Sequence, residues 1–256
     1  MEFSNKAEHD ASANADTLIL ACMDRRLNSE IDRIGGGMAV AVRNAGADAG
    51  LAKVAIERIL EQGNIDNVLI LPHLDCGAMG LVAGSLLDKK RVDDQVYSGL
   101  VRQFEGSFRS RNELESEVNP MMQRHRLEDI INGRDIGIEV RCLDPSRLNP
   151  GGTDGTHSLA IMNPSASAYE AIFKSAERSA GGMTLGMAST YVVQPFDAVS
   201  ARIAVESLGI KNVVFIAANR REAEGFKADA LFLGRQGYSS GASINIVDLT
   251  RRRIKE

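Results

Sequence analysis

Residues 17–26 read TLILACMDRR, and this stretch decides the fold class of the 256-residue chain. Its apolar first half predicts a buried strand, and the polar cluster that begins at Cys22 predicts a loop at the carboxyl end of that strand. Two further apolar runs, 38–42 and 68–71, also stop at polar clusters, and a helix is expected over 48–62 between them. Strands that alternate with helices over short connections predict an α/β fold, with a central parallel-rich sheet and flanking helices.

A polar cluster follows each of these three predicted strands. The carboxyl ends of parallel strands meet at one edge of a sheet, and open α/β sheets place their ligands there, so we expect the clusters to converge. The clusters are Cys22-Met23-Asp24-Arg25-Arg26, Arg43-Asn44-Ala45-Gly46 and His73-Leu74-Asp75-Cys76-Gly77. The sequence therefore predicts one site that combines side chains from three strand ends.

The composition indicates a soluble globular protein with a small-molecule partner. Hydrophobic residues make up 44% of the chain, enough for a sizeable core, and 30 basic against 34 acidic residues give a net charge of −4. That balance offers no case for a nucleic-acid partner or an anionic membrane surface. The sequence shows neither a signal peptide nor a run of ~18 apolar residues, so a cytoplasmic location is expected.

The three cysteines are better explained by free or metal-bound thiols than by a disulfide framework. Cys142, at the end of a later strand, is expected to be a small core residue. His73-x-x-Cys76 places an imidazole and a thiolate within one turn of each other, and Cys22 would supply a third ligand. Sulfur and nitrogen donors select zinc over magnesium or calcium, and three protein ligands leave one position open, as in catalytic zinc sites.

Asp24 lies two residues after the first predicted ligand and allows two arrangements. It could occupy the fourth zinc position itself, or it could accept a hydrogen bond from a zinc-bound water. Arg26 decides between them, because a guanidinium that pairs with the carboxylate in bidentate fashion holds it off the metal. A purely structural role is the alternative for these motifs, since a lone His-x-x-Cys arises by chance and buried cysteines often act as small apolar residues.

Taken together, the three clusters resemble the signature blocks of the β-class carbonic anhydrases, of the short type, in the same order and at similar spacing. The resemblance covers roughly residues 16–144. It implies reversible hydration of carbon dioxide to bicarbonate by a zinc-bound hydroxide, which is a lyase reaction. The implied roles are Cys22, His73 and Cys76 as ligands of one zinc ion, Asp24 and Arg26 as the catalytic dyad, and Arg43, Asn44 and Gly46 as support.

The second part of the chain faintly repeats the first, which indicates a tandem duplication. Residues 181–187 echo 36–42, and 209–216 echo 64–71, both at an offset of 145 residues. At the matching positions the second copy lacks residues that could bind zinc in the same way. His73 falls on Ala218, Cys76 on Arg221 and Arg43 on Ala188, and a less secure alignment puts Cys22 near Asn163.

The predicted domains follow from this repeat. They are a polar lead at 1–15, a zinc-binding unit at 16–144, a linker at 145–157 and a degenerate second unit at 158–256. The first unit contains a charged segment, 84–133, that is predicted to form a solvated helical face.

The resemblance also implies how the two units would work together. Members of the family act as dimers whose active sites lie at the subunit interface, so a fused second unit would make a pseudo-dimer with one zinc ion per chain. Such pseudo-dimers could in turn assemble into a homo-oligomer. Tyr191, Gln194 and Phe196 become candidates to face the site from the second unit, the alternative being ordinary core or surface positions.

Two other functions fit the same residues. Members of the family hydrolyse carbon disulfide or carbonyl sulfide when a narrow apolar tunnel restricts access to the metal. In a third interpretation the chain is a non-catalytic, zinc-stabilised binding or regulatory homologue, in which Asp24 closes the metal permanently.

Overall fold

The computed structural model of the protein describes residues 16–36, 39–62, 64–148, 158–164, 189–235 and 243–249. The predicted polar lead at 1–15, most of the predicted linker and the repeated stretch at 181–187 lie outside these ranges. The described start of the predicted linker is a single turn of 3-10 helix, Pro145–Arg147. Within the described ranges, no helix combines the length and the apolar character that crossing a membrane requires.

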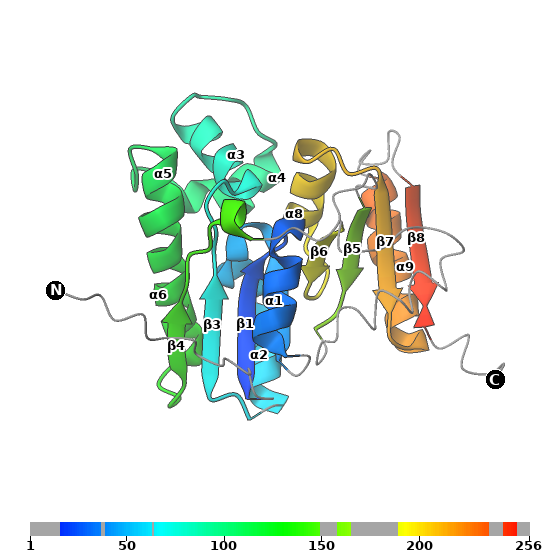
Figure 1. Ribbon diagram of the computed structural model, residues 1–256. Helices are drawn as coiled ribbons and strands as arrows, with labels where there is room; N and C mark the ends of the chain where they lie inside the picture. Colours follow the sequence, from blue (N-terminus) through cyan, green and yellow to red (C-terminus); the bar gives the residue numbers. More distant parts are fainter. Residues whose placement is uncertain are drawn as a thin grey trace.

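Eight strands form one sheet within the described residues, and helices flank it (Figure 1). The strand order is β4-β3-β1-β2-β6-β5-β7-β8, and every neighbouring pair is parallel except β2 and β6. This mostly parallel sheet with its helices confirms the predicted α/β fold class. The strands are β1 (Thr17–Cys22), β2 (Val40–Asn44), β3 (Asn67–Leu71), β4 (Gly137–Val140), β5 (Ser158–Met162), β6 (Thr190–Val193), β7 (Asn212–Ala217) and β8 (Ser243–Asp248).

The side chains of β1 alternate between two helical layers. Leu18 and Leu20 pack with α2 and α6 on one face, whereas Ile19 and Ala21 pack with α1 and α3 on the other. Both faces of this strand are buried, as its unbroken apolar run predicts. The α-helices of the described residues are α1 (Asn28–Gly35), α2 (Ala49–Gln62), α3 (Gly77–Leu86), α4 (Asp94–Val96), α5 (Arg111–Glu113), α6 (Asn119–Ile131), α8 (Ala198–Arg202) and α9 (Arg220–Arg235).

The three predicted polar clusters meet at one edge of the sheet. Strands β2 and β3 both run parallel to β1 and flank it, so the three carboxyl ends lie together. Cys22 is in register with Asn44 of β2, and Ala21 is in register with Leu71 of β3. His73 follows β3 after one proline and forms an isolated bridge with Leu143. The parallel register thus confirms that the clusters converge.

The sheet has the same connectivity when it is followed from either end. In the first half β1 lies between β2 and β3, with β4 outside them, and in the second half β5 lies between β6 and β7, with β8 outside them. The two halves join where β2 and β6 pair antiparallel, so their strands run in opposite directions across this seam (Figure 1).

The register of the strands matches individual positions of the two halves. The matching pairs are Leu18 with Leu159, Val40 with Thr190 and Val68 with Val213. Arg43 then matches Val193, and these two residues are themselves partners in the β2 and β6 pairing. The constant offset wrongly aligned Arg43 with Ala188, which lies outside the described residues, because the connection from β5 to β6 is longer than that from β1 to β2.

The halves differ most between the third and fourth strand of each. In the first half several helical segments separate α3 from β4, among them α5 and α6. In the second half the chain reaches β8 soon after the end of α9. The prediction that residues 84–133 form a solvated face is wrong in part, because Phe104, Leu114 and Gln123 are fully buried. Part of this segment, including the polar residue Gln123, therefore belongs to the core.

Candidate metal centre

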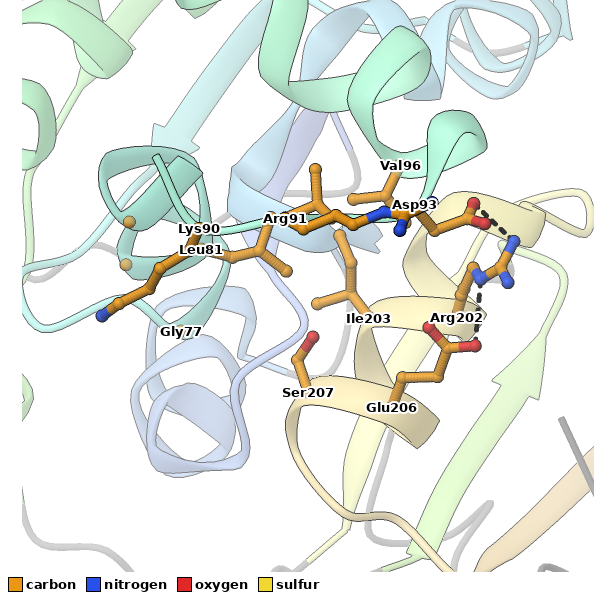
Figure 2. A pocket seen from close by; sticks show the side chains of 13 residues that line it. Gly77, Leu81, Lys90, Arg91, Asp93, Val96, Arg202, Ile203, Glu206 and Ser207 are labelled. Carbon is orange, nitrogen blue, oxygen red and sulfur yellow. Dashed lines mark hydrogen bonds and ion pairs between the residues drawn. The ribbon is translucent and has the colours of Figure 1, made fainter. Parts of the chain in front are cut away.

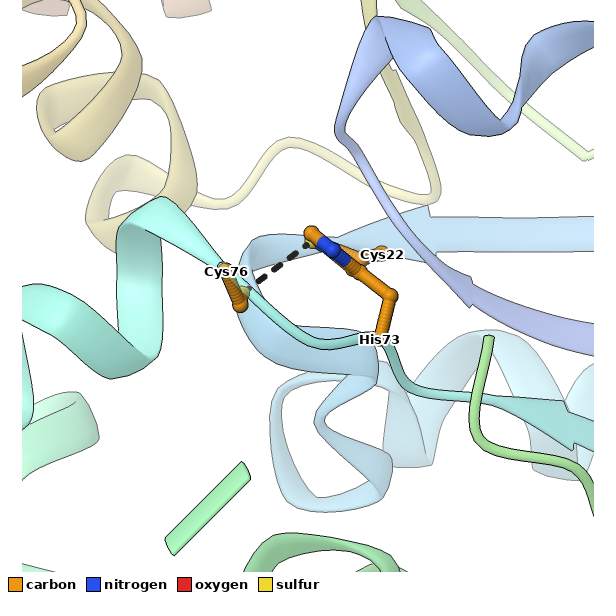
Figure 3. A group of neighbouring side chains, drawn as sticks. All are labelled: Cys22, His73 and Cys76. Atoms are coloured by element: carbon orange, nitrogen blue, oxygen red, sulfur yellow. Dashed lines mark hydrogen bonds between the residues drawn. The ribbon is translucent and has the colours of Figure 1, made fainter. Parts of the chain in front are cut away.

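Cys22, His73 and Cys76 point toward one another in the structure (Figure 3). Cys22 ends β1, His73 lies in the loop after β3, and Cys76 is the N-cap of α3. Their donor atoms all lie within 4.8 Å of one another, and the two sulfur atoms are 3.8 Å apart. All three side chains are buried, with Cys22 the most exposed at 3%. The structure therefore brings the three predicted ligands together.

The orientation of His73 leaves one ring nitrogen for a metal ion. Nδ1 lies 2.8 Å from the carbonyl oxygen of Leu74, to which it donates when it carries the proton. Nε2 is buried and has no hydrogen-bond partner among the described residues. A backbone acceptor on one nitrogen and a free lone pair on the other is the usual arrangement of a metal-bound histidine.

The two thiols shift each other's pKa values in opposite directions. Their mutual hydrogen bond lowers the pKa of Cys22 well below the usual range and raises the pKa of Cys76 well above it, and burial raises the second further. Burial is the largest influence on the pKa of His73 and lowers it, but the Cys22 thiolate and Asp24 together raise it above its ordinary value. Since thiolates are the metal-binding form, loading both sulfur atoms with a cation must release a proton.

The donor set fits zinc. Two thiolates and one imidazole are soft to borderline donors, which suit zinc and do not suit magnesium or calcium. The orphaned Nε2 of His73 and the two adjacent sulfur atoms are polar groups that a metal ion would satisfy. Cys142 is exposed and lies outside this group, which corrects its assignment as a core residue.

Arg26 holds the carboxylate of Asp24 beside this cluster. Nε of Arg26 donates to both carboxylate oxygens at 3.1 Å, Nη2 donates to Oδ2 at 2.7 Å, and the backbone N–H of Arg26 donates to Oδ1 at 2.9 Å. Burial raises the pKa of Asp24, but the hydrogen bonds from Arg26 and the nearby His73 outweigh it and bring the pKa below the ordinary value. Asp24 Oδ2 lies 3.9 Å from His73 Nε2. An ionised carboxylate, held by hydrogen bonds from Arg26 to both of its oxygens, therefore lies next to the three donors.

Asp75 shares the guanidinium of Arg26 and was not predicted as a site residue. Nη1 of Arg26 donates to Asp75 Oδ2 at 2.8 Å, and Nη2 donates to the carbonyl oxygen of Asp75 at 2.7 Å. Asp75 has a φ of 52°, a left-handed conformation that is uncommon outside glycine. The loop between His73 and Cys76 is thus fastened to the Asp24 and Arg26 pair.

Glu115 and Arg111 are two further residues at the site that the sequence did not reveal. Glu115 is 5% exposed, and its two carboxylate oxygens accept the backbone N–H groups of Asp75 and Cys76. Arg111 donates to Glu115 Oε1 at 2.8 Å. No short motif marks them, because they come from the charged helical segment about 40 residues further along the chain.

Arg43 is a buried residue that supports the carboxyl end of β1. Its fully buried guanidinium donates to the carbonyl oxygens of Cys22 at 3.1 Å and Asp24 at 2.8 Å, and to the side-chain oxygen of Asn28 at 2.5 Å. It also lies 5.5 Å from the centre of the Tyr191 ring. These contacts fix the backbone on both sides of Met23, which is a positioning function.

Asn44 and Gly46 shape the second strand end. The side chain of Asn44 accepts from the backbone N–H of Asp48 at 2.7 Å and donates to the carbonyl oxygen of Asp48 at 2.8 Å. Gly46 has a φ of 78°, and a Cβ atom there would lie 2.7 Å from the Cε of Met79. The left-handed backbone of this turn therefore favours glycine, and any larger residue would also displace the end of the Met79 side chain.

The three residues expected to face the site from the second half are placed differently from one another. Tyr191 donates its backbone N–H to the carbonyl oxygen of Met23 at 3.1 Å, and Gln194 accepts from the side chain of Asn44 at 3.1 Å. Phe196 packs instead against Phe215 and Phe232, with ring centres 6.0 and 6.1 Å away. Two of the three therefore contact residues that support the site.

The matching edge of the second half carries no comparable cluster among the described residues. Among the described residues, one group of histidine, cysteine or acidic side chains could hold a metal ion. It is Cys22, His73 and Cys76, in the first half. Ala218, at the position that matches His73, donates its backbone N–H to Glu222 at 2.8 Å. The first residues of α9 thus serve the backbone of their own helix.

A cavity of about 450 Å³ lies between the two halves and starts beside the metal centre at Gly77 (Figure 2). Its wall in the first half comes from α3 and from residues 90–96, and its wall in the second half comes from residues 202–207. Arg202 ties the two walls together, because it pairs with Asp93 at 2.5 Å across the seam and with Glu206 at 3.1 Å. The two halves therefore line a common cavity in addition to sharing a sheet.

Comparison with known proteins gives weak likeness to solved structures. No family model matches the chain, and no curated protein matches it. Eight chains of solved structures match. Among them is a carbonic anhydrase from Glaciozyma antarctica, 22% identical with a TM-score of 0.36 over 54% of this chain and 84% of that one. A likeness at this TM-score shows nothing about the chemistry of this chain.

Proposed function

We propose that this protein is a zinc-dependent carbonic anhydrase of the β-class that interconverts carbon dioxide and bicarbonate. The observation that carries the proposal is the group of three buried donors within 4.8 Å of one another, with an arginine-bound carboxylate beside them. A structural zinc site is closed by a fourth protein ligand, whereas this group offers three. The arrangement therefore favours a catalytic site over a structural one.

In this proposal Cys22, His73 and Cys76 hold the zinc ion. The ion supplies Lewis acidity, which lowers the pKa of a coordinated water to about 7. Asp24 Oδ2, close to His73 Nε2, accepts a hydrogen bond from the reacting water and so orients it. Arg26 keeps the carboxylate ionised and turned to that task through its hydrogen bonds to both oxygens.

We also propose that the chain is a tandem duplication that forms a pseudo-dimer. The sheet supports this, because the strand order is the same from both ends and the matching residues Arg43 and Val193 pair across the seam. The zinc-binding unit spans 16–144, the linker 145–157 and the degenerate unit 158–256. Tyr191 and Gln194 then act as groups that a partner subunit would otherwise supply. One zinc ion per chain follows.

A second candidate function keeps the site and changes the substrate. The three predicted ligands are at most 3% exposed, so a substrate must be small, and carbon disulfide and carbonyl sulfide are small and apolar like carbon dioxide. The free thiols of all three cysteines are compatible with the reducing cytoplasm that we propose as the location.

The test is to measure zinc content and turnover of carbon dioxide, carbon disulfide and carbonyl sulfide on the same purified protein. We expect one zinc ion per chain and fastest turnover of carbon dioxide, rising with pH. Fastest turnover of a sulfur substrate would establish the second candidate. One zinc ion per chain with no turnover of any of the three would instead identify a non-catalytic zinc protein.

A further inference from the structure

The loop from His73 to Cys76 has to hold two ligands in one geometry, although its own backbone is strained. Asp75 adopts a φ of 52° there, and such a conformation persists only when surrounding contacts hold it. Cys76 is the N-cap of α3, but no side-chain hydrogen bond caps this helix locally. The backbone N–H groups of Asp75 and Cys76 lie just before this helix and have no backbone acceptor among the described residues, so they need an acceptor from elsewhere.

Glu115 supplies that acceptor from the segment Leu114–Val118, 39 residues beyond Cys76. Its Oε2 accepts the backbone N–H of Asp75 at 2.8 Å, and its Oε1 accepts the backbone N–H of Cys76 at 3.0 Å. The side chain is 5% exposed, so these charge-assisted hydrogen bonds are shielded from water. One carboxylate thus fixes two consecutive peptide groups, of which the second belongs to a predicted ligand.

Arg111 completes the fixation from the other side. Its Nε donates to Glu115 Oε1 at 2.8 Å, and its Nη2 donates to the carbonyl oxygen of Cys76 and to Asp75 Oδ1, both at 3.2 Å. Since Arg26 binds the remaining carboxylate oxygen of Asp75, that residue lies between two guanidinium groups. The contacts link Glu115 to the Asp24 and Arg26 pair as well as to Cys76.

The second half shows that a helix at this place in the fold does not require a distant carboxylate. At the start of α9, Asn219 Oδ1 accepts the backbone N–H of Glu222 at 3.0 Å, and Glu222 accepts the backbone N–H of Ala218 at 2.8 Å. These adjacent residues cap the helix locally, in an arrangement that differs from a capping box only in that Glu222 accepts from the residue before the N-cap. The position that matches Cys76 there is Arg221, and the metal cluster is confined to the first half among the described residues. Among the described residues, the contact with a distant carboxylate is therefore found in the half that carries the predicted ligands.

We propose that Glu115 is a positioning residue for the metal centre. It fixes the backbone of Asp75 and Cys76 so that the Cys76 sulfur stays beside the Cys22 sulfur and the His73 nitrogen, and this raises the affinity for zinc. Arg111 assists by holding both Glu115 and the carbonyl oxygen of Cys76. The inference rests on the proposed function only in taking the metal to be zinc.

The substitution Glu115→Gln tests this with minimal change of volume. The amide keeps one acceptor oxygen and places an NH₂ donor against the other backbone N–H, so one of the two peptide groups loses its partner. Glu117→Gln is the matched control, because Glu117 lies in the same segment and is exposed. The readouts are zinc affinity by competition with a chelator, the visible spectrum of the cobalt-substituted protein, and the thermal midpoint of the metal-free protein.

We expect Glu115→Gln to weaken zinc binding by about 10- to 100-fold and to alter the thiolate-to-cobalt bands, while Glu117→Gln leaves both unchanged. Unchanged affinity and spectrum in Glu115→Gln would overturn the proposal. So would a lower thermal midpoint with unchanged affinity, because that would mean a structural role alone.

If Glu115→Gln fails to fold, Arg111→Ala decides the question, because the Arg111 side chain is 45% exposed and Glu115 keeps its two backbone N–H partners without it. We expect weaker zinc binding in that variant, by a smaller factor, and wild-type affinity would overturn the proposal. Wild-type protein that binds one zinc ion without hydrating carbon dioxide would contradict the proposed function and leave this inference intact. Active wild-type protein with unaffected Glu115→Gln would contradict only the inference.

Discussion

The two halves of the sheet share a strand order and differ at the edge where the polar clusters lie. In the first half β1 and β3 lead into Cys22, His73 and Cys76, whose donor atoms converge. In the second half the matching strands β5 and β7 lead into Asn163 and Ala218. The comparison teaches that buried, parallel strands of this length form without the predicted ligands, so the sheet itself does not require those three residues.

The halves also differ in the helical segments that contact this edge of the sheet. The first half has Glu115 and Arg111 from a long helical segment, and they contact the backbone of the ligand loop. The second half has no described counterpart of this segment, and α9 is capped by its own residues. Three side chains at strand ends are therefore only part of the metal centre, and the supporting contacts come with the extra segment.

The largest expected effect comes from removing a ligand. Cys76→Ala should abolish zinc binding and reduce carbon dioxide hydration to the uncatalysed rate, because a two-ligand site holds zinc poorly. Arg221→Ala, at the matching position of the second half, is the control and should leave both zinc content and turnover unchanged. Zinc content by atomic spectroscopy and stopped-flow hydration measure the two quantities. Wild-type turnover in zinc-free Cys76→Ala would break the comparison.

Replacing the buried guanidinium should have the next largest effect, on stability. Arg43→Met leaves the carbonyl oxygens of Cys22 and Asp24 without a partner and should lower the free energy of unfolding by about 3–5 kcal/mol. Val193→Ile, at the position that pairs with Arg43 across the seam, adds one buried methylene and should cost less, about 1–3 kcal/mol. Urea unfolding compares the two. Equal losses would mean that Arg43 acts only as filling of the core.

Loss of the guanidinium next to Asp24 should lower turnover more than zinc content. Arg26→Gln removes the bidentate contact that orients Asp24, and we expect carbon dioxide hydration to fall by about 10- to 100-fold with zinc still bound. Arg25→Gln, one residue earlier in the chain, should have a much smaller effect. Equal losses in both variants would contradict the pairing of Asp24 with Arg26.

Acid should affect one carboxylate of each half in opposite ways. Arg26 lowers the pKa of Asp24 in the folded protein, so the stability from this pair is present above the unfolded pKa of about 3.9 and is lost as pH falls through the lower, folded pKa. Burial raises the pKa of Asp197, so its contribution is present below the unfolded pKa and is lost as pH rises through the folded one.

Urea unfolding of metal-free protein from about pH 7 to about pH 3 tests these signs. The advantage of wild-type protein over Asp24→Asn should shrink toward acid, whereas the advantage over Asp197→Asn should grow. Asparagine remains a good N-cap, so the contacts of Asp197 with Val199 are largely kept. Parallel trends in the two variants would contradict the assigned environments.

The smallest effect is expected at the helix cap of the second half. Asn219→Ala removes the acceptor of the Glu222 N–H and should lower the free energy of unfolding by about 1 kcal/mol. Zinc affinity should not change, in contrast to Glu115→Gln at the corresponding helix of the first half. A change of zinc affinity in Asn219→Ala would show that the two caps are not functionally distinct.

The sequence was sufficient for the fold class and for bringing the ligands together, because both depend on local signals. Unbroken apolar runs locate β1 and β3, and parallel pairing places Cys22 and His73 at one edge. It was not sufficient for Glu115 or Asp75. Their contacts depend on how a helical segment about 40 residues away packs, and no spacing rule records that.

Local sequence patterns also failed to predict which positions of the two halves correspond to each other. A constant offset predicted Ala188 as the position of the second half that matches Arg43, but the strand register gives Val193, since the length of a connection can change without changing the strands it joins. Phe196 was likewise expected at the site and lies instead in an aromatic cluster with Phe215.

Zinc K-edge X-ray absorption on protein of measured zinc content tests the central claim most directly. The claim is that one half of the sheet binds one zinc ion through two thiolates and one imidazole. We predict one zinc ion per chain, with two sulfur neighbours at about 2.3 Å and nitrogen or oxygen neighbours at about 2.0–2.1 Å. Two zinc ions per chain, or a zinc ion with only nitrogen and oxygen neighbours, would contradict it.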